Sequence, residues 1–159
     1  MKISILSIIF LAVLLVTHAG NAQENPKADT LSTRVSKNSN IKSENHHVEI
    51  VDGKCTVFEI QVARGGDPRI DAQITYGLIF EVSSGQTTFE MNHWAEINAY
   101  LEISRCRCIN RGYNPITNGY IKGHQQENGN WEIEASVIAK GKDNGEDIPF
   151  KFKGIVSDH

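Results

Sequence analysis

The residues with the greatest chemical potential in this chain are its three cysteines. Cys55 stands alone, whereas Cys106 and Cys108 are separated by one residue. On a strand such a pair points to the same side, and bridging it would strain the backbone, so we expect a disulfide from Cys55 to Cys106 or Cys108. A Cys-x-Cys pair can also hold copper or zinc, but it needs further ligands and is not a zinc signature. We therefore expect no metal and no cofactor.

A second group of residues suited to chemistry surrounds the paired cysteines. The planar guanidinium groups of arginine and the rings of tyrosine bind carboxylates, phosphates, sugars or a partner protein. The alternative is a solvated loop whose arginines pair with nearby acids. The candidate binding residues are Tyr100, Arg105, Arg107, Arg111 and Tyr113.

Catalytic motifs are missing from the sequence. Gly-x-Ser-x-Gly, Ser-x-x-Lys and Walker A patterns do not occur. Glu132 and Glu134 lie two residues apart, and paired carboxylates can hydrolyse glycosides. We expect these two to face Lys122 and His124 on a solvated surface, so a small secreted hydrolase is the least favoured function.

The composition is that of one ordinary globular domain. The chain has 159 residues, a formal net charge of −3 and 40% hydrophobic residues. Lys and Arg together number 16 and do not exceed the 19 Asp and Glu, which excludes a strongly basic nucleic-acid binder. We expect no nucleic-acid partner.

The N-terminus has the pattern of an export signal. Lys2 is followed by an apolar run over residues 3–16, shorter than the ~20 residues that span a bilayer. Gly20 and Ala22 suit a signal peptidase, so we expect residues 1–22 to be a signal peptide. An uncleaved N-terminal anchor is the alternative. The signal predicts an exported protein, periplasmic or secreted, without a transmembrane anchor.

Residues 23–46 are rich in polar side chains. Their only large apolar residues are Leu31, Val35 and Ile41. Such a segment buries too little apolar surface to offset its ordering entropy, so we expect a flexible polar leader. Residues 47–159 would then form a single all-β domain.

Asn-Gly turns set the register of two predicted hairpins. A three-residue loop that ends at Gly129 pairs Ile121 with Ala135 and His124 with Glu132. A two-residue loop at 144–145 pairs Ala139 with Phe150, which places apolar residues on one face.

Three further turns connect the earlier strands. Asp52-Gly53 is expected to pair Val48 with Val57, and Ser84-Gly85 to pair Phe80 with Phe89. The glycine-rich loop at 65–68 should join the strand around Phe58 to a long strand over 69–82. Over residues 95–104, apolar and polar residues alternate as they do in a strand, although apolar residues there also have the spacing of one face of a helix.

These hairpins predict seven to nine antiparallel strands in meander order. The expected fold is a β-sandwich or a lipocalin-like up-and-down barrel. The expected function is that of an exported, non-enzymatic β-domain that binds an unknown protein, glycan or small ligand at the cell envelope or outside the cell. The alternative is a small β-barrel that carries an apolar ligand in its interior.

The export signal makes a direct prediction about the mature protein. Protein recovered from its natural compartment should begin at Gln23, because cleavage is expected after Ala22. Intact mass spectrometry checks this, and recovery of a chain that still carries residues 1–22 would contradict it.

Overall fold

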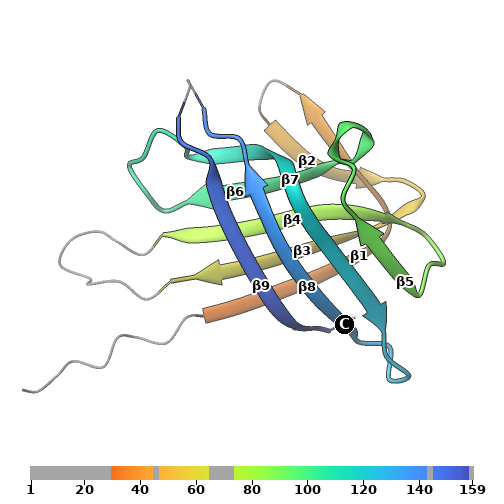
Figure 1. The fold of residues 1–159 in the computed structure, drawn as a ribbon. Helices are drawn as coiled ribbons and strands as arrows, with labels where there is room; N and C mark the ends of the chain where they lie inside the picture. Colours follow the sequence, from red (N-terminus) through yellow and green to blue (C-terminus); the bar gives the residue numbers. More distant parts are fainter. Residues whose placement is uncertain (1–29, 45–46, 65–73, 143–144, 158–159) are drawn as a thin grey trace, which may run out of the picture.

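The computed structural model describes residues 30–44, 47–64, 74–142 and 145–157 as an all-β protein (Figure 1). The predicted signal peptide, the glycine-rich loop at 65–68 and Asn144 lie outside these residues. The elements, in chain order, are β1 (Thr30–Glu44), β2 (His47–Asp52), β3 (Cys55–Ala63), β4 (Thr75–Ser83), β5 (Thr88–Met91), the 3-10 turn η2 (Trp94–Glu96), β6 (Ala99–Ser104), β7 (Gly112–Gln125), β8 (Trp131–Ala139) and β9 (Ile148–Val156).

The nine strands form one continuous antiparallel sheet that folds onto itself. Its order is β2-β1-β3-β4-β6-β7-β8-β9, and β5 pairs with the free side of β7. In Figure 1, β8 and β9 cross in front of β3 and β4. The ends of this path are not paired with each other among the described residues, so the sheet is not closed into a barrel. Nine antiparallel strands are confirmed, whereas the barrel expectation is wrong.

The long strand β7 belongs to both halves of the sheet. Residues 112–115 pair with β6, and residues 116–125 pair with β8. A register shift between Ile116 and Asn118 marks the bend. Gly119 follows with a φ of +98°, and a Cβ there would lie 2.1 Å from the carbonyl oxygen of Ser136, so only glycine fits. The indole N–H of Trp94 donates to the Gly119 carbonyl at 3.1 Å and supports the bend.

An aromatic cluster fills the space between the two halves. The Phe58 ring on β3 stacks on Phe80 at 5.1 Å and meets Trp131 of β8 edge-on at 5.2 Å. Phe89 of β5 lies 5.7 Å from Phe80 and 5.6 Å from Trp131. Phe58 and Phe80 lie opposite each other on the paired strands β3 and β4, whereas the contacts of Trp131 and Phe89 with them join strands that do not pair with one another. Packing of these rings therefore holds the two halves of the sheet against each other.

The expectation of a flexible leader is wrong for residues 30–44, which form β1. Residues 30–36 pair with β3 and residues 39–44 pair with β2, separated by a bulge and by Asn38 at φ +51°. Pairing satisfies the backbone hydrogen bonds of this polar segment, and Ile41 is buried against Val57 and Ile79 on the outer face of the sheet. Backbone pairing therefore orders a stretch whose side chains alone predicted disorder.

Two predicted hairpins do not form. Asp52-Gly53 does not place β2 beside β3, because β1 lies between them and Ser39 is opposite both Asp52 and Cys55. Ser84-Gly85 does not place β4 beside β5, because β4 pairs with β6 and β5 pairs with β7. Phe80 and Phe89 still meet, but across the core rather than along a ladder.

The predictions for the later turns agree more closely with the structure. The hairpin that contains Gly129, at φ +86°, has the predicted pairs Ile121–Ala135 and His124–Glu132. The β8–β9 hairpin is shifted by two residues from the prediction, so that Ala139 is opposite Ile148 and not Phe150. A shift of two preserves the faces, so the buried side was predicted correctly.

The middle of the chain supports two further expectations. β3 pairs with β4, with Phe58 opposite Phe80 and Ile60 opposite Leu78. The ambiguous segment contains the strand β6 over its second part, preceded by η2. The strand interpretation is therefore confirmed from Ala99 onward.

The aromatic cluster makes a prediction about stability. Phe58→Ala should lower the free energy of unfolding by about 3–5 kcal/mol, because Phe58 is fully buried and contacts both halves of the sheet. Ile155→Ala should cost less than about 1 kcal/mol, since Ile155 is 43% exposed. Urea unfolding of both variants measures the difference, and equal losses would show that Phe58 does not anchor the core.

Candidate binding site at the β6–β7 loop

The candidate arginines all lie on the loop that joins β6 to β7. We call residues 105–111 the arginine loop. It begins at Arg105, whose φ of +58° is unusual for a residue with a side chain, and it is followed by Gly112, the first residue of β7, whose φ is +97°. The Arg111 amide donates to the Cys108 carbonyl at 3.2 Å. These local bends turn the chain sharply between two paired strands.

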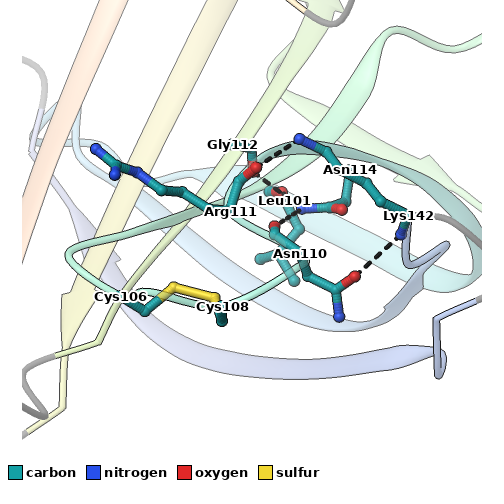
Figure 2. The surroundings of a disulfide bond; sticks show 8 residues. All are labelled: Leu101, Cys106, Cys108, Asn110, Arg111, Gly112, Asn114 and Lys142. Carbon is teal, nitrogen blue, oxygen red and sulfur yellow. Dashed lines mark hydrogen bonds between the residues drawn. A yellow bond between two sulfur atoms is a disulfide. The ribbon is translucent and has the colours of Figure 1, made fainter.

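The predicted bridge from Cys55 to Cys106 or Cys108 is wrong. Cys106 and Cys108 are bonded to each other, with their Cα atoms 5.3 Å apart, and Cys55 is free (Figure 2). The strand register explains why. Cys55 is opposite Ser83 of β4, whereas Ala63 at the other end of β3 is opposite Thr75. Thr75 is in turn opposite Ser104, the last residue of β6 before the arginine loop. The length of β3, about 26 Å at ~3.3 Å per residue, therefore separates Cys55 from the arginine loop.

Asn114 anchors the arginine loop from beneath. Its side chain is fully buried, and its amide nitrogen lies within 3.2 Å of the Leu101 carbonyl and 2.9 Å of both the Asn110 and Gly112 carbonyls. Figure 2 shows this amide pointing toward the loop backbone. One buried donor thus replaces the water that these carbonyls would otherwise bind.

A second set of hydrogen bonds ties the arginine loop to the segment between β8 and β9. The Lys142 amide donates to the Asn110 side-chain oxygen at 3.0 Å, and the Lys142 ammonium donates to the Arg111 carbonyl (Figure 2). A Cβ on Gly145 would lie 3.0 Å from that same Asn110 oxygen. The two loops therefore pack closely.

The arginine side chains of the loop face solvent. Arg105, Arg107 and Arg111 are exposed, and among the residues that the structure describes none of them forms an ion pair. Ile109 is 64% exposed and is the most exposed large hydrophobic side chain described. Arg64, also exposed, lies at the same end of the sheet with its guanidinium 5.1 Å from the Tyr76 ring centre. The loop therefore presents positive charge around an apolar tip.

The two candidate tyrosines lie away from the loop tip. Tyr100 and Tyr113 are half-buried and pack with Ile50 against a buried cluster on the outer face. The members of that cluster are Ile41, Val48, Val57 and Ile79. The structure thus keeps the three arginines together and assigns both tyrosines to packing beneath the β1–β2 hairpin.

Sequence reasoning missed a shallow acidic pocket beside Tyr113. Its lining includes Glu59, Glu102 and Tyr113, around the space left by the missing side chain of Gly77. Burial and the neighbouring Glu59 raise the pKa of Glu102, and burial followed by Glu102 and Glu59 raises the pKa of the Tyr113 hydroxyl. Alternation places both glutamates on one face, but only the pairing of β3, β4 and β6 brings them to one hollow.

The paired glutamates on β8 are part of a charge network on the opposite half. Glu134 accepts from the Tyr120 hydroxyl at 2.7 Å and pairs with Lys122 at 3.3 Å and Lys153 at 3.2 Å. These donors, the tyrosine first, lower the pKa of Glu134 to about 2. The His124–Glu132 pair lies beside it, with 3.6 Å between nitrogen and oxygen. A carboxyl group held ionised in this way cannot donate a proton near neutral pH.

Within 30–44, 47–64, 74–142 and 145–157, no three His, Cys, Asp or Glu side chains are grouped to hold a metal ion. The same residues contain no helix with the length and apolar character needed to cross a bilayer.

The comparisons with known proteins give no relatives. No protein-family model matches this chain, and no curated protein and no solved structure resembles it significantly.

The anchoring of the arginine loop is testable through Asn114. Asn114→Ala should lower the free energy of unfolding by about 1–3 kcal/mol, because three buried or half-buried carbonyls lose their donor. Backbone hydrogen exchange should accelerate across residues 105–112. Asn92→Ala, at an exposed position, controls for the loss of an asparagine. Unchanged exchange in the loop would show that Asn114 does not hold it.

Proposed function

We propose that this chain is an exported, non-enzymatic binding domain whose arginine loop docks onto an acidic segment of a partner protein, at the cell envelope or outside the cell. The observation that carries the proposal is the grouping of three exposed arginines without ion pairs among the described residues, on a loop anchored by a buried asparagine. The N-terminal signal pattern supports export.

The chemistry of the arginine loop favours a protein partner. Guanidinium groups bind carboxylates through two parallel hydrogen bonds, and arginine is enriched among the residues that dominate protein interfaces. Ile109 supplies exposed apolar surface between Arg107 and Arg111. A protein segment that combines carboxylates with an apolar side chain matches this arrangement.

The anchoring of the loop supports the same proposal. A binding loop that is ordered before it meets its partner loses less conformational entropy on association. The hydrogen bonds from Asn114 and Lys142 hold Asn110 and the backbone of Arg111 without using any arginine side chain. The guanidinium groups thus remain available to a partner.

The carrier alternative receives less support from the packing. A carrier holds its ligand in an apolar cavity of about 300 Å³ or more. Here the space between the two halves of the sheet contains the stacked rings of Phe58, Phe80, Phe89 and Trp131. These rings occupy the centre that a ligand would need.

Binding to an acidic peptide tests the proposal. A fluorescent oligoglutamate peptide should bind the mature chain with an affinity that falls as salt is added, because exposed charges are screened. The R105Q/R107Q/R111Q variant should bind at least about tenfold more weakly, since three exposed ion pairs of up to ~1 kcal/mol each exceed the 1.4 kcal/mol of a tenfold change. Fluorescence anisotropy measures both affinities.

A matched variant separates local charge from net charge. K42Q/K54Q/K151Q removes the same number of positive charges from exposed positions on other strands and turns. It should retain the affinity of the unaltered chain. Equal weakening in the two triple variants would show that only net charge matters and would overturn the assignment of the arginine loop.

A further inference from the structure

The disulfide of the arginine loop closes too short a segment of chain to stabilise the fold appreciably. A cross-link stabilises mainly by restricting the unfolded chain, and its effect grows with the length of the loop it closes. Cys106 and Cys108 have one residue between them. The loop backbone is held instead by Asn114 and Lys142, which bond to Asn110, Gly112 and Arg111. The anchoring of residues 110–112 therefore does not use the S–S bond.

The two sulfur atoms also lie in surroundings that favour reaction. Cys108 is exposed and Cys106 is partly exposed. Arg105 and Arg107 flank Cys106 in the chain, and positive charge beside a cysteine stabilises its thiolate. A stabilised thiolate is a good leaving group when another thiolate attacks the disulfide. Exposed disulfides of this kind are typically labile, catalytic or regulatory.

Cys55 provides the contrast within the same chain. Burial, followed by the nearby Glu81 carboxylate, raises the pKa of its thiol. The Asn40 side-chain amide lies 3.6 Å from its sulfur. Cys55 is also at the far end of β3 from the arginine loop, so it cannot serve as a third partner in exchange at that loop.

We propose that Cys106 and Cys108 form a thiol–disulfide exchange centre that oxidises dithiols of other molecules. This activity is separate from the binding function proposed above, because it requires the S–S bond and a thiol substrate but no acidic segment. The substrate class is a peptide or protein with two neighbouring cysteine thiols.

The exchange proceeds in two balanced steps. A substrate thiolate attacks the exposed Cys108 sulfur, a mixed disulfide forms, and the Cys106–Cys108 bond breaks to release the Cys106 thiolate. The second substrate thiolate then attacks the substrate sulfur of the mixed disulfide and releases the Cys108 thiolate. The substrate loses two electrons and gains a disulfide, and the chain gains two electrons as a dithiol, with protons exchanged with water.

The rate of exchange with a defined peptide tests the proposal. The mature chain carrying Cys55→Ala, which removes the third thiol, is mixed with a synthetic peptide that contains two cysteines. Mass spectrometry should find one peptide disulfide formed per chain. The rate should rise in proportion to the peptide concentration without added denaturant, since the folded protein reacts. A rate that is independent of peptide concentration and rises only in urea would indicate a protected structural bond and would overturn the proposal.

The role of the flanking arginines has its own comparison. R105Q/R107Q in the same background should slow exchange by about tenfold, because the leaving thiolate loses its neighbouring charges. K42Q/K54Q removes two positive charges elsewhere and should leave the rate unchanged. Circular dichroism and thermal unfolding confirm that both variants are folded. Equal rates in the two variants would overturn the proposed activation by arginine.

A trapping experiment assigns the attacked sulfur. The reduced Cys55→Ala/Cys106→Ala variant retains only Cys108, so the disulfide-linked dimer of a peptide with a single cysteine should leave a mixed disulfide on Cys108, because this mixed disulfide carries no second thiol that could resolve it. The matching Cys55→Ala/Cys108→Ala variant should react more slowly, because Cys106 is less exposed. Faster trapping on Cys106 would contradict attack at Cys108.

Discussion

The architecture depends on the bend in β7. Its first residues complete the ladder with β6, and the remainder pairs with β8 on one side and β5 on the other. The bulge after Ile116 and the glycine at 119 turn the strand, so one sheet becomes two facing layers. Phe58 then reaches Trp131, although their strands share no hydrogen bonds. Without the bend, the large apolar side chains of either half would face water.

The same strand controls the position of the candidate site. Asn114 lies on β7 just before the bend, and its buried amide holds the carbonyls of Leu101, Asn110 and Gly112. The arginine loop is thus attached to the rigid part of the fold through its backbone. Charge on the side chains is separated from the hydrogen bonds that fix the loop, which is the arrangement that both a binding loop and an accessible disulfide require.

The sequence determined the features that depend on neighbouring residues. Alternation of apolar and polar residues identified strands after residue 47 and their buried faces, but not the polar strand β1, because successive side chains of a strand point to opposite sides. The turn at Gly129 gave the correct register for β7 and β8, since a short loop with one left-handed residue leaves a single alignment. The clustering of Arg105, Arg107 and Arg111 was also predictable, because all three lie within one loop.

Only the tertiary structure decided which strands are neighbours. The insertion of β1 between β2 and β3 and the pairing of β5 with β7 leave no local mark, because backbone hydrogen-bonding groups are the same at every residue. The cysteine pairing followed from that order: the register placed Cys55 at the opposite end of β3 from Cys106 and Cys108. The packing of the two tyrosines has the same cause, since the β1–β2 hairpin covers the face on which Tyr100 and Tyr113 lie.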